Sequence, residues 1–132
     1  MHKVRDLMIK TDKFPVVNQN TMLKEAISIM QELNLGFICI IDDEKKLKAV
    51  FSDGDIRRKL LNVQKPLSSF FIDDIILHST SNPTTCNEDE DILVVVSKMC
   101  SKKIWDIPVI DNDGFLVGLI HLHDAINSLI KI

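Results

Sequence analysis

The sequence lacks a long apolar segment. Its longest purely apolar runs are residues 37–41 and 92–96, whereas a helix that spans a membrane needs about 18 apolar residues or more. The first six residues, MHKVRD, also lack the apolar stretch of a secretory signal. We therefore expect a cytoplasmic protein with no membrane partner.

The sequence also lacks an excess of positive charge. Sixteen lysines and arginines face 19 aspartates and glutamates, for a net charge of -3, which does not favour nucleic acid as a partner. Cysteine is scarce as well: Cys39, Cys86 and Cys100 are odd in number and lack the spacing of a metal site. Cys39 and Cys100 fall inside apolar patterns, so we expect reduced core residues rather than zinc ligands or redox groups.

The length of 132 residues suits one ordinary domain or two very small ones. It is too short for a catalytic domain together with an elaborate accessory domain. The sequence also offers no convincing nucleophile and base together, as a stand-alone enzyme would require.

Two segments of the chain resemble each other. Residues 41–56 read IDDEKKLKAVFSDGDI, and residues 110–125 read IDNDGFLVGLIHLHDA, with equivalent positions 69 residues apart. Upstream, Pro15 and Pro83 match with an offset of 68, so one residue of slippage lies in a loop between them. This pattern indicates two copies of one supersecondary unit.

Each copy contains the same predicted elements. Apolar residues at three- and four-residue spacing predict a helix over residues 22–33 and again over residues 92–100. Two strands around a polar turn follow, from Phe37 to Phe51 or from Ile107 to Ile120. A closing helix then begins near Asp55 or Asp124. We expect the closing helices to turn these apolar residues inward: Ile56, Leu60, Leu61, Ala125, Ile126, Leu129 and Ile130.

The fold class predicted from this order is α+β, with two β-α-β-β-α repeats. One repeat cannot cover its own sheet and helix stripes, so the two copies should pack together with pseudo-two-fold symmetry. We assign residues 1–62 to the first repeat and residues 63–132 to a linker and the second. Residues 4–8 should form a short leading helix equivalent to residues 73–77, and residues 62–81 should form the connector.

The repeat, the order of elements and the strand-end motif Ser52-x-x-Asp55 resemble the tandem CBS-pair (Bateman) family over almost the whole chain. Residues 4–8 (VRDLM), 51–58 (FSDGDIRR) and 117–124 (VGLIHLHD) are further similar to the C-terminal half of arabinose 5-phosphate isomerases of the sugar isomerase (SIS) family. The stretch SDGDIRR also resembles the CBS pairs of certain sugar nucleotidyltransferases, which remain an alternative.

The resemblance implies a regulatory module and not an enzyme, because nothing in these residues supplies the isomerase domain that precedes the pair in that family. The implied partners are a SIS-type isomerase domain, in the same chain or in a complex, and a second CBS pair in a homodimer. No cofactor is required. The implied ligand is an adenine nucleotide or, for an isomerase serving lipopolysaccharide synthesis, an activated CMP-sugar.

For the first copy, the resemblance implies that Ser52 meets the ribose or phosphate of a nucleoside and that Asp55 accepts from the two ribose hydroxyls. Arg57 or Arg58 is a candidate phosphate partner near the start of the helix, and Val17 and Phe37 are candidate walls. The purely structural alternative is a strand-to-helix turn, with Ser52 or Asp53 capping the helix.

The second copy departs from this pattern. His121 stands where the hydroxyl is expected, Asp124 keeps its place, and Thr85, Trp105 and Pro108 are the expected walls. His121 can contact a phosphate or carboxylate of a different ligand, or cap the helix. A metal site at His121-x-His123-Asp124 is a further alternative, although we expect no metal. An assembly module with empty clefts is the competing function for the whole chain.

Overall fold

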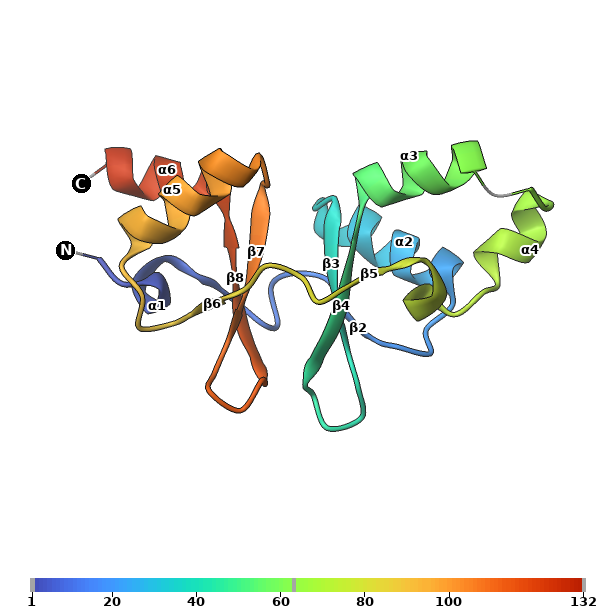
Figure 1. Cartoon of the computed structure of the whole chain (residues 1–132), viewed down its shortest axis with the longest axis horizontal. Helices are drawn as coiled ribbons and strands as arrows, with labels where there is room; N and C mark the ends of the chain where they lie inside the picture. Colours follow the sequence, from blue (N-terminus) through green and yellow to red (C-terminus); the bar gives the residue numbers. More distant parts are fainter. Residues whose placement is uncertain (1, 63, 132) are drawn as a thin grey trace. The chain divides into compact units, whose positions relative to one another are not determined.

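The computed structural model describes residues 2–62 and 64–131. The chain divides into two compact units, which Figure 1 shows coloured along the sequence. We call Phe14–Pro83 the first-repeat unit, and Met1–Lys13 together with Thr84–Ile132 the second-repeat unit. Both units combine helices with a mixed four-stranded sheet, so the predicted α+β class is confirmed.

The first-repeat unit contains the sheet β2-β3-β4-β5. β2 is parallel to β3, whereas the β3–β4 and β4–β5 pairs are antiparallel. Figure 1 shows the helices of this unit on one side of its sheet. In chain order its elements are β2 (Val16–Asn18), α2 (Leu23–Leu33), β3 (Phe37–Ile41), β4 (Leu47–Ser52), α3 (Asp53–Asn62), α4 (Leu67–Phe71), the 3-10 helix η1 (Ile75–His78) and β5 (Thr80–Ser81).

The second-repeat unit contains the sheet β1-β8-β7-β6, with β6 parallel to β7 and the other two pairs antiparallel. The two sheets therefore have the same topology, since β6, β7, β8 and β1 take the places of β2, β3, β4 and β5. In chain order its elements are α1 (Val4–Leu7), β1 (Ile9–Lys10), β6 (Cys86–Asn87), α5 (Ile92–Lys102), β7 (Asp106–Ile110), β8 (Leu116–His121) and α6 (Leu122–Ile130).

The leading segment of each repeat belongs to the unit of the other repeat. β1 pairs with β8 of the second repeat, and β5, which precedes the second repeat, pairs with β4 of the first. The compact units thus differ from the division at residues 62 and 63, which follows the order of the repeat along the sequence. That division stays a prediction, and its limits at residues 1, 63 and 132 lie outside the described residues.

The turns of the two hairpins have equivalent backbone hydrogen bonds. Asp42 Oδ1 accepts hydrogen bonds from the amides of Glu44 (2.9 Å) and Lys46 (3.0 Å), and these bonds lower the pKa of Asp42. Asp111 Oδ1 accepts from the equivalent amides in the second repeat. The residue two positions before the second strand has positive φ in both turns, 69° at Lys45 and 89° at Gly114.

Each unit has its own buried core. Phe51 of β4 and the equivalent Ile120 of β8 are both fully buried in these clusters. The first-repeat core contains the buried residues Val17, Leu23, Ala26, Met30, Ile38, Ile40, Ala49, Phe51, Phe70 and Ile75. The second contains Val4, Cys86, Ile92, Val95, Met99, Ile107, Val109, Ile120, Leu122 and Ala125. Packing of the two units with pseudo-two-fold symmetry remains a prediction.

Part of the predicted inward pattern is wrong. Helix α3 has no buried residue, and Leu60 and Leu61 are exposed, as are Ile126 and Ile130 of α6. Ala125 is buried, and Ile56 and Leu129 pack against the cores, so the inward stripe of each closing helix is narrower than the spacing suggests.

The connector and one cysteine also differ from expectation. The segment 62–81 contains helix α4 after Pro66, and residues 73–77 do not form an α-helix: the 3-10 helix η1 begins only at Ile75. Cys100 is exposed on α5, whereas Cys39 and Cys86 are buried as predicted, and burial raises the pKa of Cys86 to about 12.

Candidate functional site

The motif Ser52-x-x-Asp55 closes the junction between β4 and α3. Asp55 Oδ2 accepts hydrogen bonds from the amide of Ser52 (2.9 Å) and from its hydroxyl (3.2 Å). In return, Ser52 Oγ accepts from the amide of Asp55 (3.3 Å). This reciprocal pair is a capping box, so the motif satisfies backbone groups at the start of the helix.

Arg58 covers the other oxygen of the same carboxylate. Its Nη2 donates to Asp55 Oδ1 at 2.7 Å, three residues along the helix. The Arg58 side chain is 60% exposed, whereas that of Asp55 is 13% exposed. The guanidinium lies over the first turn of α3, since a Cβ built on Gly54 would meet Nη1 and Nη2 at 3.2 and 3.3 Å. Both Asp55 oxygens therefore have partners.

We call the junction at Ser52 and Asp55 the first half-site, and the junction at His121 and Asp124 the second half-site. The residues expected to form the walls of the first half-site are only partly accessible to a ligand. Phe37 is half-buried and is the register partner of Ser52, so the two residues lie opposite each other on neighbouring strands. Gly36 lies under Asp53, whose Oδ2 would be 2.2 Å from a Cβ at that position. Val17 pairs with Ile40 and is 7% exposed in the core, so little of its side chain can contact a ligand.

In the second repeat, β8 ends at His121, which pairs in register with Asp106 of β7. His121 Nδ1 lies 2.7 Å from Asp106 Oδ1, and the two side chains are 23% and 9% exposed. Burial raises the pKa of Asp106, opposed by its bond to His121. The sequence does not single out Asp106, because only the register across the hairpin brings it to His121.

His121 occupies the N-cap position of α6, but its side chain makes no capping hydrogen bond. The capping alternative for His121 is therefore wrong, because the ring is held by Asp106 instead. Asp124 is exposed, and in residues 2–62 and 64–131 no hydrogen bond or ion pair to its carboxylate is found. Asn127 stands where the first repeat has Arg58. The carboxylate of Asp55 is thus already hydrogen-bonded by Ser52 and Arg58, whereas no such partner of Asp124 is found among the described residues.

The backbone around the second half-site repeats that of the first. The amide of Leu122 donates to the carbonyl of Trp105 (2.8 Å), as the amide of Asp53 donates to that of Gly36 (3.0 Å). Trp105 is 68% exposed. Thr85 is half-buried and its carbonyl accepts from Lys98 Nζ (3.2 Å), whereas Pro108 is buried.

The metal alternative finds no support in the geometry of the described chain. Within residues 2–62 and 64–131, no three His, Cys, Asp or Glu side chains are grouped to hold an ion. The rings of His121 and His123 lie 6.5 Å apart between centroids. The same residues include no helix long and apolar enough to cross a membrane.

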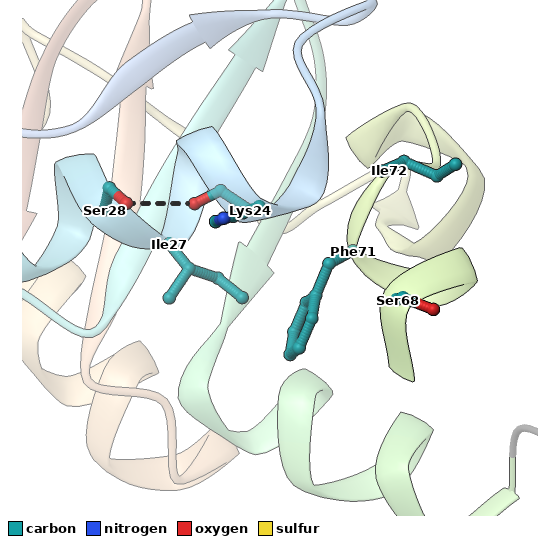
Figure 2. Close-up of a pocket in the computed structure, with 6 residues that line it drawn as sticks. All are labelled: Lys24, Ile27, Ser28, Ser68, Phe71 and Ile72. Atoms are coloured by element: carbon teal, nitrogen blue, oxygen red, sulfur yellow. Dashed lines mark hydrogen bonds between the residues drawn. The ribbon is translucent and has the colours of Figure 1, made fainter. Parts of the chain in front are cut away.

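A groove of about 610 Å³ lies elsewhere in the first-repeat unit, between α2 and α4. Figure 2 shows Ile27 and Phe71 on either side of it, with Ser28 Oγ donating to the Lys24 carbonyl at 3.1 Å. None of the residues predicted to bind a ligand lines this groove.

Two consecutive matches to the CBS domain family model cover residues 4–62 and 72–131. The chain belongs to the CBS domain family, as a tandem pair. This membership confirms the resemblance seen in the repeat and in the Ser52-x-x-Asp55 motif.

Curated relatives extend the comparison. The chain is 28% identical over 127 residues to an arabinose 5-phosphate isomerase, GutQ, of Escherichia coli, and 29% identical over 128 residues to the arabinose 5-phosphate isomerase KdsD of Salmonella typhi. These matches cover 94% and 96% of the chain but 37% of each relative. An uncharacterized protein of Rickettsia prowazekii is 30% identical over 95% of the chain, again spanning 37% of that relative.

Solved CBS pairs have the same fold. CBSX2 in complex with AMP superimposes with a TM-score of 0.87 at 23% identity, over 99% of this chain and 98% of that one. The CBS pair of protein MJ0100, in complex with 5'-methylthioadenosine and S-adenosyl-L-methionine, gives 0.82 at 26% identity, over 99% and 97%. The first likeness concerns the fold alone.

Proposed function

We propose that this CBS pair is a regulatory module that binds a ligand containing adenosine at its strand-to-helix junctions. The observation that carries the proposal is the placement of Ser52 and Asp55, and of His121 and Asp124, at the same point of a duplicated backbone. The CBS pair of MJ0100, 26% identical to this chain, binds two adenosine compounds. An adenosine ligand is therefore the first choice for this pair.

The chemistry of the junction suits a nucleotide. An ionised carboxylate can accept hydrogen bonds from both hydroxyls of a ribose, and bonds to charged groups are the stronger kind. The first amides of a helix favour phosphate, and an arginine beside them can bind it with two parallel bonds. The first-repeat unit offers this combination at Asp55, Gly54 and Arg58.

We further propose that the module controls a sugar-phosphate isomerase of the arabinose 5-phosphate type. The support is the 28% and 29% identity to two such isomerases, of which this chain spans 37%. The isomerase domain would belong to the same protein or to a complex in the cytoplasm, and this chain would not be the catalyst. A CMP-sugar end product remains the second candidate ligand. A sugar nucleotidyltransferase with a CBS pair remains the second candidate for the protein to which this pair belongs.

A ligand-free assembly module is the competing function. Apolar side chains stay exposed on several helices, and a closed two-fold dimer is the commonest way to cover such surface. They are Leu60, Leu61, Leu67, Ile72 and Leu77 in the first-repeat unit, and Leu93, Val94, Ile126 and Ile130 in the second. A homodimer is compatible with ligand binding, so the two functions differ in whether a ligand binds at all.

Thermal unfolding with a panel of ligands tests the proposal. AMP, 5'-methylthioadenosine, S-adenosyl-L-methionine, CMP and a CMP-sugar are each added to the wild type and to the double variant Asp55→Asn/Asp124→Asn. A ligand that binds only the native state, at 100 times its dissociation constant, adds about 2.7 kcal/mol to stability. We expect stabilisation by an adenosine compound in the wild type and a much smaller effect in the double variant. Absence of stabilisation across the panel would favour the assembly function.

A further inference from the structure

We propose that Arg58 acts as a latch on Asp55, which makes the first-repeat half-site selective for nucleosides that carry a phosphate. The inference rests on the proposed nucleotide binding and adds a selectivity to it. The observation is that Arg58 Nη2 binds Asp55 Oδ1 at 2.7 Å while Ser52 occupies Oδ2.

While Arg58 is bonded to Asp55, the carboxylate has few acceptor sites left for the hydroxyls of a ribose. Its Oδ2 already accepts two hydrogen bonds from Ser52, and Oδ1 accepts the charged donor of Arg58. The carboxylate is 13% exposed, so few of its acceptor sites face solvent. Two ribose hydroxyls can bind well only after Arg58 has left Oδ1.

A phosphate can compete with Asp55 for the guanidinium of Arg58. The guanidinium lies over the first turn of α3, close to Gly54, where the helix dipole favours an anion although the amides of Asp53 and Asp55 are already bonded to Gly36 and Ser52. A phosphate placed there would bind the guanidinium with two parallel bonds, which the single contact with Asp55 does not provide. Because the Arg58 side chain is 60% exposed, its movement requires no repacking of the core.

The second repeat has no such latch. Asn127 occupies the position of Arg58, and Asp124 is exposed. Among the described residues of α6, Lys131 at its C-cap is the nearest cation along the chain, at the opposite end of the helix from Asp124. Among the described residues, no cation has to leave Asp124 before a ribose can bind there.

Calorimetric titration with AMP and with adenosine tests the latch. Arg58→Ala should weaken AMP binding about tenfold or more, because it removes a charged partner of the phosphate. The same substitution should strengthen adenosine binding by about two- to fivefold, because an exposed ion pair no longer competes for Asp55. Lys59→Ala removes another cation from the same helix and serves as the control, with both affinities unchanged.

A double-mutant cycle tests whether the stronger adenosine binding of Arg58→Ala comes from the release of Asp55. In an Asp55→Asn background, Arg58→Ala should no longer strengthen adenosine binding, because the charged acceptor is already absent. Repeating the series with Asp124→Asn removes the contribution of the second repeat. If Arg58→Ala weakens AMP and adenosine equally, or changes neither, the latch is wrong while nucleotide binding stands. If neither compound binds the wild type, nucleotide binding itself is wrong and the latch falls with it.

Discussion

In the first repeat the junction between β4 and α3 is closed by bonds among Ser52, Asp55 and Arg58, whereas the junction between β8 and α6 in the second holds His121 against Asp106. The sheets around the two junctions have the same strand order and the same antiparallel hairpin. Duplication has therefore kept the backbone while the side chains diverged. Under the proposed function, the shared backbone gives the two junctions the same place in each repeat, and their different side chains give them different ligand preferences.

The largest effect should come from the equivalent core positions Phe51 and Ile120, both fully buried. Phe51→Ala should lower the free energy of unfolding by about 3–5 kcal/mol and Ile120→Ala by about 2–5 kcal/mol, from lost burial and the cavity left behind. Chemical denaturation followed by circular dichroism measures both. Leu61→Ala, at an 80% exposed position, is the control and should change stability by less than about 0.5 kcal/mol. Equal, small losses at all three positions would refute the assigned cores.

A second difference lies in the β8–β1 pair. A Cβ at Gly118 would meet Met8 Sδ at 2.6 Å and the carbonyl oxygen of Ile9 at 3.0 Å. Gly118→Ala should therefore cost about 1–3 kcal/mol, because the backbone oxygen cannot move aside as a side chain can. The equivalent residue of the first repeat is Ala49, and the reverse change, Ala49→Gly, should cost about 1 kcal/mol or less. A neutral Gly118→Ala would show that β1 does not pair closely with β8.

The pair Asp106–His121 should give the second repeat its own pH dependence. Burial raises the pKa of Asp106 in the folded state above its ordinary value of 3.8. The stability that Asp106 contributes is therefore fully present below pH 3.8 and is lost as the pH rises through the higher folded pKa. Asp106→Asn should consequently gain stability relative to the wild type between about pH 4 and pH 7. Urea unfolding across this range measures the difference.

Asp124→Asn is the control for that series, since it removes an exposed carboxylate close to the same pair. It should not reproduce the pH dependence of Asp106→Asn. A wild-type-to-Asn difference that stays constant from pH 4 to pH 7 would contradict the buried environment assigned to Asp106.

The smallest effect should come from the hairpin turns. Lys45 has φ 69° at the position where the second repeat has Gly114 with φ 89°. Lys45→Gly should raise the free energy of unfolding by up to about 1 kcal/mol, because glycine adopts this conformation without steric cost, and Gly114→Lys should lower it by a similar amount. Thermal melts of the two variants and the wild type check the opposite signs. Changes of the same sign would mean that the turns are not equivalent.

Much of the fold follows from the sequence because its determinants are local. Both hairpins, from Phe37 to Phe51 and from Ile107 to Ile120, lie within one residue of where the apolar strands and polar turns place them. Helix α3 begins at Asp53, where the reciprocal bonds between Ser52 and Asp55 cap it, whereas α6 begins at the equivalent Leu122 without a side-chain cap. Helix α4 was missed, since its five residues carry only Pro66 as a start signal.

Other features depend on contacts between distant residues. Nothing local in Ile9 and Lys10, or in Thr80 and Ser81, indicates that each pair adds a strand to the sheet of the other repeat. The partner of His121 is 15 residues away and depends on the β7–β8 register. The predicted ligand residues of each repeat lie together in one unit, but their role in binding stays a prediction.

Titration of the adenosine compound that stabilises the wild type, into the wild type and into Asp55→Ala, measures whether Asp55 binds the ribose. If Asp55 accepts from a ribose, affinity should fall about tenfold to a hundredfold or more, since each bond to a charged group contributes about 1.5–3 kcal/mol. Asp53→Ala removes an equal charge from the same helical turn and should leave affinity nearly unchanged. Unchanged affinity of Asp55→Ala, with a lowered melting temperature, would contradict the account and leave Asp55 a helix cap alone.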